Sequence, residues 1–239
     1  MEMPLQHQIM GYDRVTSMFS PDGRLLQVEY AEKMVRRGFA SIGIVCQDGV
    51  LIVANKRPFD KLSLPENVKI LEVDSHIAAT GAGMLSDARI LIDRAQLQAQ
   101  QHRVTYDESV DVESVVKEIA DLKQMTTQFG GARPFGVEVI ITGVNTDNEK
   151  KLYVTDVAGN YFAYKATAVG ENEDKIKEEL RNMYKDDLKI EDGIKMCLEI
   201  LKKLLGKSFD IRRVDCAYIT TKDKQFTRLE SEKLKRYVK

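Results

Sequence analysis

The side chains that most often do chemistry are scarce in this sequence of 239 residues. The usual metal ligands and thiol nucleophiles are His7, His76, His102, Cys46, Cys197 and Cys216. No histidine belongs to an H-E-x-x-H or H-x-E pattern and no two cysteines form a C-x-x-C pair, so we expect no metal site. Each cysteine has apolar neighbours in the chain, which predicts buried, reduced thiols.

Two glycine-containing segments each match part of a phosphate-binding motif, but each lacks a glycine that the motif requires. Gly81-Ala82-Gly83 could open a dinucleotide fingerprint, yet Ser86 stands at the position of the third glycine. Gly206-Lys207 could close a P-loop, yet Leu201 stands where that loop needs glycine. A G-x-S-x-G nucleophile elbow is also absent from the sequence. We therefore expect no cofactor.

The charge balance excludes several classes of partner. The chain has 36 Lys plus Arg, 37 Asp plus Glu, a net charge of -1 and 43% hydrophobic residues. This composition is typical of a globular protein and lacks the basic field of a nucleic-acid-binding protein. No apolar run reaches the roughly 18 residues of a membrane span, and residues 1–11 lack the apolar stretch of a signal peptide. We expect a cytoplasmic protein with no nucleic-acid or membrane partner.

The elements that must position any site are predicted from hydrophobic periodicity. Helices are expected at residues 24–37, 85–99, 112–125, 172–184, 190–205 and from 231, and strands at 40–46, 50–54, 68–73, 76–80, 136–144, 152–157, 161–164, 214–220 and 225–228. The turn Ser20-Pro21-Asp22-Gly23 precedes the first helix, and Gly38 follows it. Because grouped strands are followed by paired helices, we expect antiparallel sheets with helices layered outside them.

The chain is expected to form a single domain over residues 1–239, because it contains no linker-like stretch and no internal repeat. Residues 1–11 would be a flexible tail, residues 24–37 an N-terminal helix, residues 40–228 the body, and residues 229–239 a C-terminal helix. The tail has no apolar core of its own, so it would order only against a neighbour.

The N-terminal region is the most specific part of the sequence. The distinctive segments are Gly11-Tyr12-Asp13-Arg14, Phe19-Ser20-Pro21-Asp22-Gly23-Arg24-Leu25, Gln27-Val28-Glu29-Tyr30-Ala31, Lys69-Ile70, Ser86-Asp87-Ala88-Arg89, Gly130-Gly131-Ala132-Arg133-Pro134-Phe135-Gly136-Val137 and Tyr164-Lys165-Ala166-Thr167-Ala168. Together they resemble the proteasome α-type subunits over residues 11–228. The absence of long charged tails makes the chain more similar to archaeal members.

The resemblance implies an α+β fold, the four-layer α-β-β-α sandwich of N-terminal-nucleophile hydrolases, with two antiparallel sheets and an extra N-terminal helix. It also implies a heptameric ring of identical or related α subunits, stacked on proteolytic β subunits. Such a ring gates the access of unfolded proteins to the β chamber. It also receives the C-terminal tails of an activating AAA ATPase in pockets between its subunits.

The same resemblance implies that the chain is not itself a peptidase. Alignment puts Phe39 at the position of the family's N-terminal threonine and Asn55 at that of its aspartate, and retains the lysine as Lys69. None of the 15 glycines is followed by Thr, Ser or Cys, so cleavage after glycine would free no nucleophile. Two alternatives stay open: a hydrolase with an unusual nucleophile such as Cys46 or Ser41, and an α-like scaffold that assembles without β partners.

Two functional sites are implied by the resemblance. The residues that match the cluster holding the open conformation of the tail are Tyr12, Asp13, Pro21 and Tyr30. Five residues match the docking pocket for an ATPase tail. Lys69 would pair with the terminal carboxylate of the tail. The walls of the pocket would be Gly38, Gly83 and Met84, and Arg24 would supply a further positive charge. Without the resemblance, Pro21 would serve only a helix-entry turn, Tyr30 would fill the helix stripe, and Lys69 would be an ordinary surface lysine.

One position departs from the family pattern. Archaeal members commonly carry arginine two residues after the helix tyrosine, whereas this chain has Glu32 followed by Lys33. A negative charge there would weaken the binding of an anionic tail, unless Lys33 or Arg24 compensates.

Overall fold

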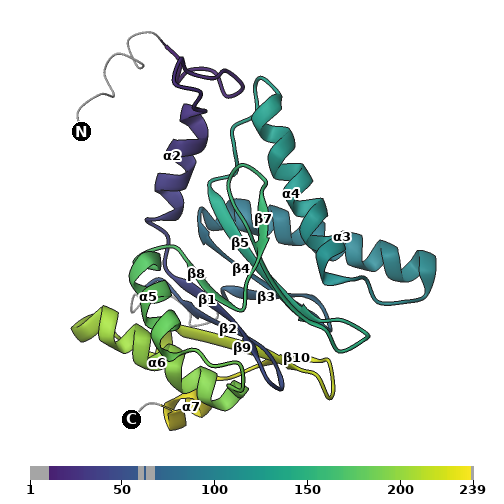
Figure 1. Ribbon diagram of the computed structural model, residues 1–239, viewed down its shortest axis with the longest axis vertical. Coiled ribbons are helices and arrows are strands. Elements are labelled where there is room, and N and C mark those ends of the chain that lie inside the picture. The colour runs from purple at the N-terminus through teal and green to yellow at the C-terminus, as the bar shows by residue number, and fades with distance from the viewer. Residues whose placement is uncertain (1–10, 59–61, 63–67, 238–239) are drawn as a thin grey trace.

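A computed structural model describes residues 11–58, 62 and 68–237 of the chain. Its strands form two five-stranded sheets in the orders β10-β9-β2-β1-β8 and β3-β4-β5-β6-β7, and every strand pairing is antiparallel. Helices cover the outer faces of both sheets, with α3 and α4 on one side and α5 and α6 on the other (Figure 1). The α+β four-layer sandwich implied by the sequence is therefore confirmed.

The elements of the first half-sandwich are β1 Ser41–Cys46, β2 Gly49–Asn55, β8 Ala166–Val169, α5 Glu173–Met183, α6 Ile190–Leu205, β9 Val214–Thr220 and β10 Phe226–Arg228. Those of the second are β3 Ile70–Asp74, β4 Ile77–Gly83, α3 Leu85–Tyr106, α4 Val112–Gln128, β5 Val137–Val144, β6 Lys150–Thr155 and β7 Tyr161–Ala163. The helix α2 Leu26–Val35 precedes both, and α7 Ser231–Leu234 follows them.

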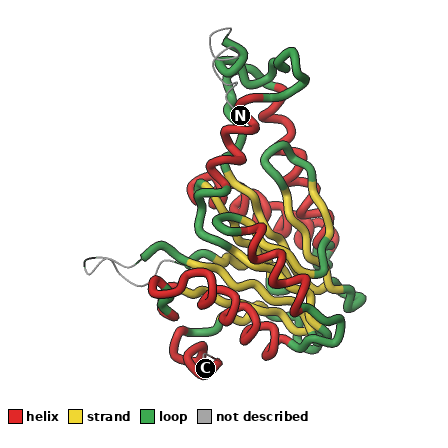
Figure 2. The backbone as a smooth tube through the Cα atoms, turned by 60° about the vertical axis from the view of Figure 1, so that its left-hand side comes forward, coloured by secondary structure: helices red, strands yellow, loops and turns green. Residues whose placement is uncertain are grey.

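Apolar side chains fill three separate layers between these elements, and Figure 2 shows the strands enclosed by helices. One layer lies between the first sheet and α5 and α6, one between the second sheet and α3 and α4, and one between the two sheets. Representative members, in that order, are Ile44 with Ile194, Ile119 with Ile141, and Ile52 with Ile140. Each such buried side chain contributes about 1.5–3 kcal/mol of hydrophobic stabilisation.

The N-terminal helix is shorter than the predicted range of 24–37. Arg24 stays in the preceding turn, where its carbonyl accepts a hydrogen bond from the amide of Ser20 at 2.9 Å. Gly38 ends the helical segment by donating to the carbonyl of Val35 at 2.8 Å. Val28 and Val35 of α2 join the core between the sheets, so burial of one face sets the helix in place.

One strand was missed by the sequence prediction. β8 has four residues and no alternation, and it exists because it pairs with β1, with Ser41 opposite Val169. Only Tyr164 and Lys165 separate it from β7, which belongs to the other sheet. The amide of Tyr164 donates to Leu152 in the second sheet at 2.9 Å, and the carbonyl of Lys165 accepts from Val45 in the first at 2.7 Å. The chain thus crosses between the sheets without losing backbone hydrogen bonds.

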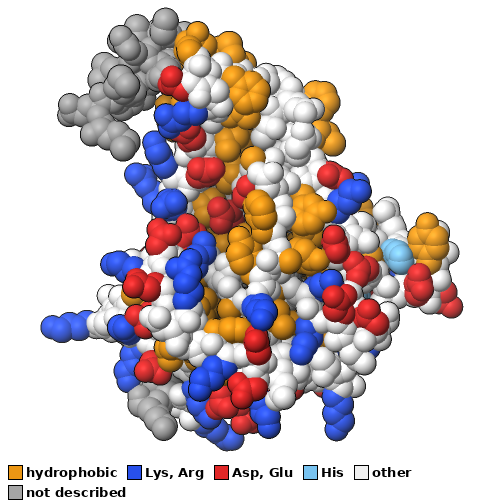
Figure 3. All heavy atoms as spheres, viewed as in Figure 1, with side chains coloured by type: hydrophobic (Ala, Val, Ile, Leu, Met, Phe, Trp, Pro, Cys, Tyr) orange, Lys and Arg blue, Asp and Glu red, His pale blue; other side chains and the backbone are white. Residues whose placement is uncertain are grey.

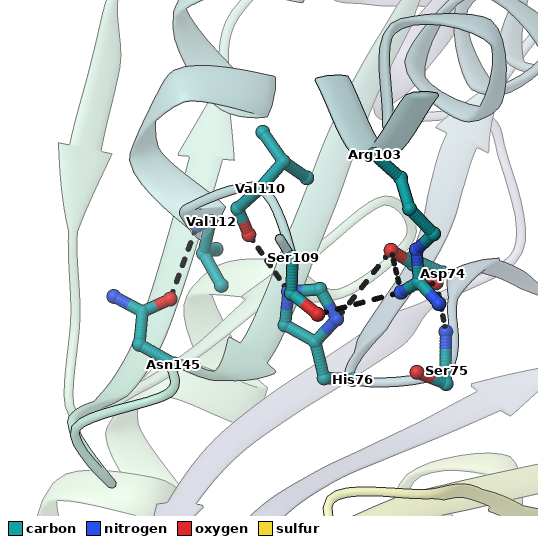
Figure 4. Close-up of polar contacts among 8 residues, drawn as sticks. All are labelled: Asp74, Ser75, His76, Arg103, Ser109, Val110, Val112 and Asn145. Atoms are coloured by element: carbon teal, nitrogen blue, oxygen red, sulfur yellow. Dashed lines mark hydrogen bonds and ion pairs between the residues drawn. The ribbon is translucent and has the colours of Figure 1, made fainter. Parts of the chain in front are cut away.

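The far end of α3 is anchored by a polar network around the turn between β3 and β4 (Figure 4). His76 Nε2 lies 2.7 Å from the carbonyl oxygen of Val110, in the connection between α3 and α4. Arg103 Nη2 donates to both carboxylate oxygens of Asp74, at 2.8 and 2.9 Å. Asn145 Oδ1 accepts from the amide of Val112 at 3.1 Å. These contacts fix the direction of α3, whose other end carries residues of the candidate site.

The C-terminal helix is also shorter than predicted. Within residues 229–239, α7 covers Ser231–Leu234 and a 3-10 turn covers Lys235–Tyr237, and residues 238–239 lie outside the described part. None of the helices in the described ranges has the length and apolar character needed to cross a bilayer.

Candidate functional site

Lys69 lies where the two sheets meet behind the end of α2. The residue is 8% exposed, and its Nζ donates to the carbonyl oxygens of Phe39, Ala40 (3.2 Å) and Asn55 (3.1 Å). We call these three carbonyls the Lys69 cage. They precede β1, or end β2, so the ammonium group joins the ends of two paired strands.

Two carboxylates lie beside the cage. Asp215 Oδ2 accepts from the amides of Lys69 at 2.8 Å and of Ile70 at 3.0 Å, and Glu171 Oε1 accepts from Asn55 Nδ2 at 3.1 Å. Burial lowers the pKa of Lys69 to about 7, although Glu171 and Asp215 favour the charged ammonium. Lys69 can therefore change its charge near neutral pH.

The groups around Phe39 do not form an activated nucleophile. Ser41 and Thr80 are fully buried with their hydroxyl oxygens 3.5 Å apart, and Thr80 donates to the carbonyl of Lys69 at 2.9 Å. Burial raises the pKa of Cys46 to about 12, which keeps its thiol protonated at neutral pH. Among the described residues, the hydrogen bonds of Lys69 Nζ go to carbonyl oxygens and to neither hydroxyl, so the lysine is not placed to activate them.

Backbone segments pack against each other at the end of α2 without intervening side chains. A Cβ atom on Gly38 would lie 2.1 Å from the amide nitrogen of Gly83, and one on Gly83 would lie 2.3 Å from the carbonyl oxygen of Gly136. Gly83 also has a φ of +116°, which side-chain-bearing residues rarely adopt. We call Gly38, Gly83 and Gly136 the glycine contact. Met84 borders it, since its amide donates to the Gly136 carbonyl at 2.8 Å.

Four of the five predicted docking residues therefore come together and the fifth does not. Lys69 reaches the carbonyl of Phe39, the neighbour of Gly38, while Gly83 and Met84 lie on the other side of Gly38. Arg24 is at the opposite end of α2, a helix of 10 residues and so about 15 Å long. There Arg24 pairs with Glu29 through two hydrogen bonds.

Glu32, the departure noted in the sequence, lies on the exposed side of α2. Desolvation and the carboxylate of Asp156 raise its pKa. Its effect on the binding of an anionic tail stays a prediction.

Two of the four residues assigned to the tail cluster, Asp13 and Tyr30, are in direct contact. Tyr30 Oη donates to Asp13 Oδ2 at 3.5 Å, and Gln27 Nε2 donates to the backbone carbonyl of Asp13. Tyr12 is partly buried beside them, whereas Pro21 is exposed in the turn before α2. Sequence reasoning gave Gln27 no role. The available signal was its spacing of three residues from Tyr30, which puts both side chains on one helix face.

A second pair that sequence reasoning left without a role joins two of the distinctive segments. Arg133 Nη1 and Nη2 bind the two carboxylate oxygens of buried Asp87 at 2.7 and 2.8 Å, and the amide of Gly136 donates to the same carboxylate at 2.9 Å. Burial raises the pKa of Asp87, but these hydrogen bonds outweigh it and hold that pKa below its usual value. Arg133 Nη2 also lies 3.2 Å from Met84 Sδ. The pair therefore fixes the start of α3 against the glycine contact.

Comparison with known proteins gives a consistent result. The family described as "Proteasome subunit" matches residues 35–219, and the N-terminal signature of the A-type proteasome subunits matches residues 12–33. The chain is 44% identical over 229 residues to the proteasome alpha subunit of Pyrococcus horikoshii, covering 95% of this chain and 87% of that relative. It is 43% identical over 230 residues to the proteasome alpha subunit of Archaeoglobus fulgidus, covering 96% and 93%.

Proposed function

The chain belongs to the proteasome subunit family as an α-type member, and we propose that it is a non-catalytic subunit that forms the gated outer ring of the proteasome core. Seven copies form the ring, which stacks on a ring of proteolytic β subunits. Unfolded polypeptides pass through the centre of the α ring on their way to the β chamber.

The observation that carries this proposal is the N-terminal segment. Residues 12–33 match the α-type signature, and inside that segment Asp13 is held against α2 by Tyr30 and Gln27. Because α2 binds Asp13, the chain is anchored there, and the residues before Asp13 start from a defined position beside α2. The tail predicted at residues 1–11 falls almost wholly outside the described residues, and we assign it the role of the gate.

The absence of a peptidase activity of its own is supported by the surroundings of Lys69. A retained lysine acts in catalysis only beside a nucleophile, and here Phe39 stands at that position with its carbonyl bound to the lysine. The raised pKa of Cys46 also argues against the alternative of a thiol nucleophile.

Ring formation is supported by the apolar surface of the single chain. Figure 3 shows apolar side chains along the face between α2 and α4, among charged groups of both signs. Large hydrophobic side chains with 55–63% of their surface exposed include Phe19, Phe129 and Phe162. Side chains of this size are usually covered when they form a contiguous patch, and neighbouring copies of the chain would cover them.

ATPase docking uses the Lys69 cage and the glycine contact. The terminal carboxylate of a tail would draw Lys69 Nζ away from the carbonyls of Phe39 and Ala40, exchanging two of its three neutral acceptors for one charged partner. The glycine contact lets the tail backbone approach closely. Arg24, which is remote from this cage within one chain, would act on the pocket of a neighbouring copy. Several tails on one ring act together, so a weak single contact suffices.

Assembly and gating can be tested together. The full-length chain should form ring complexes, and fluorogenic peptides should be cleaved only after β subunits are added. Deletion of residues 1–11 should increase cleavage in the assembled barrel, and replacement of the same residues by a Gly/Ser sequence of equal length provides the matched control. A chain that stays monomeric at high concentration would contradict the assembly proposal. Rings that never bind β subunits would favour the scaffold alternative, and unchanged cleavage after deletion would remove the gate assignment.

A further inference from the structure

A basic hollow of about 900 Å³ opens at the end of α6, and its lining includes none of the residues assigned to ATPase docking or to the tail cluster. It is lined by residues 207–213 together with Pro58 and Lys235. Ligand sites for small molecules commonly enclose about 300–1,000 Å³, so the hollow has the size of such a site.

Arg213 contributes a cation that is almost fully buried. The residue is 9% exposed, its Nε donates to the carbonyl of Lys56 at 3.2 Å, and its Nη1 donates to the carbonyl of Ser208 at 3.0 Å. Its guanidinium carbon lies 5.7 Å from the centroid of the Phe39 ring. Among the described residues no carboxylate is within ion-pair distance of it. A buried guanidinium with only neutral partners is incompletely compensated, and an anion is the ligand that completes it.

Of the other three cations that line the hollow, two form ion pairs with a neighbouring carboxylate and one does not. Arg212 Nη2 binds Asp210 Oδ2 at 2.7 Å, and Lys235 Nζ binds Glu232 Oε1 at 2.7 Å. Hydrogen bonds from Arg212 are the main cause of the lowered pKa of Asp210, and Arg213 adds only a weaker attraction from a distance. Lys207 is exposed and makes no ion pair with any described residue. The hollow therefore presents two positive charges that have no ion-pair partner among the described residues, one on buried Arg213 and one on exposed Lys207.

Two positive charges select the class of anion. A carboxylate carries a single negative charge, whereas a phosphoryl group carries about -1.5 to -2 at neutral pH and three acceptor oxygens. The planar fork of arginine suits such oxygens, and lysine adds a mobile point charge. Pro58, Phe209 and Ile211 also line the hollow and offer apolar contact to the rest of a ligand. We propose that this hollow binds a phosphorylated small molecule, with the phosphoryl group held by Arg213 and Lys207.

The proposal is tested by isothermal titration calorimetry of the full-length chain with pyrophosphate, ADP and acetate. Pyrophosphate and ADP should bind, more weakly as salt is added, and acetate should give no measurable heat. Lys207→Ala should weaken pyrophosphate binding about five- to tenfold, the loss of one charge-assisted hydrogen bond. The matched control is Lys222→Ala, an exposed lysine beyond the other end of β9, which should change the affinity less than about twofold.

Charge reversal makes the test independent of folding defects at Arg213. Lys207→Glu alters an exposed residue, so it should keep the thermal unfolding midpoint and abolish pyrophosphate binding. The proposal is overturned if the unmodified chain binds no pyrophosphate, or if Lys207→Ala and Lys222→Ala bind it equally well. Binding of a short acidic peptide in the absence of pyrophosphate binding would also overturn it, because a carboxylate would then be the preferred anion.

Discussion

Lys69 and Lys123 are both buried and both bound to carbonyl oxygens, yet they lie in different surroundings. Lys123 Nζ donates to the carbonyls of Val137 (3.0 Å), Thr155 (3.0 Å) and Asp156 (3.1 Å) and to the hydroxyl of Thr155 (2.7 Å). Burial lowers the pKa of each lysine to about 7. Chemically the two sites are nearly equivalent.

The difference is in what each lysine connects. Lys123 is 0% exposed and joins α4 to the strand ends beneath it, so it can bind nothing outside its own layer. Lys69 retains 8% exposure, and two of its three carbonyl partners belong to the segment that leaves α2. Burial of a lysine is thus not in itself a sign of function. A connection to the segment between α2 and β1 is what separates Lys69 from its structural counterpart.

The largest effect is expected for Lys123→Met. This change keeps the apolar stem but leaves four buried oxygen atoms without their donor, which should lower the free energy of unfolding by about 3–4 kcal/mol. Urea unfolding of the full-length chain measures this. Lys117→Met, at an exposed position of the same helix, should leave the urea midpoint unchanged. Equal effects of the two changes would mean that Lys123 does not bind its carbonyls in solution.

Lys69→Met should destabilise less, by about 2–3 kcal/mol, because the cage is closer to solvent and water can replace part of it. The same variant should lose stimulation of peptide cleavage by an ATPase, whereas Lys123→Met, where it assembles, should keep it. Stimulation that persists in Lys69→Met would refute the docking role and make the two lysines equivalent.

Both Lys69 and Lys123 should contribute to the pH dependence of the free energy of unfolding. Folding lowers the pKa of each from 10.5 to about 7, so between these values the unfolded chain holds a proton on each lysine that the folded chain has released. Stability therefore rises with pH across this window and does not change below it through these groups. From pH 7 to 9 each lysine should add about 2 kcal/mol. Unfolding measured at both pH values should show the rise halved in Lys123→Met and retained in Lys117→Met.

The smallest effect is expected for the ion pair next to the glycine contact. Arg133→Lys keeps the charge but loses the two-pronged contact with Asp87, and should cost about 1 kcal/mol because the arginine side chain is 57% exposed. Thermal unfolding measures the cost. A loss as large as that of Lys69→Met would show that Asp87 depends on Arg133 as strongly as the cage depends on its lysine.

Long amphipathic elements could be predicted closely from the sequence. The helix at residues 190–205 and the strand at residues 214–220 have the predicted bounds, because each carries a complete periodic pattern between clear boundaries. The strand β8 could not be predicted, since four residues acquire a strand conformation only by pairing with β1. Hydrophobic periodicity also could not predict that on α4 the lysine Lys123 is buried while Met125 is 47% exposed.

The candidate site was predictable in part. Resemblance pointed to Asp13 and Tyr30, which are in contact, and to Gly38 and Gly83, whose backbones touch. The burial of Lys69 was not predictable, because its carbonyl partners come from two segments that meet only in the folded chain. The pairing of Asp87 with Arg133 was hidden for the same reason, because the two residues are 46 positions apart in the sequence.

The short crossing at Tyr164 and Lys165 ties the two sheets together along one edge of the sandwich. Two intervening residues span at most about 11 Å, close to the distance of about 10 Å between packed sheets, so the sheets cannot separate there. The opposite edge is closed by hydrogen bonds such as that from the Phe226 amide to the Ser75 carbonyl at 2.6 Å. The two sheets are therefore held together along both edges, by the chain itself at β7–β8 and by hydrogen bonds at β3–β10. Gly38, whose carbonyl accepts from the Glu171 amide at 2.7 Å just beyond β8, lies beside the covalently joined edge, where the spacing of the sheets is fixed by the length of the chain.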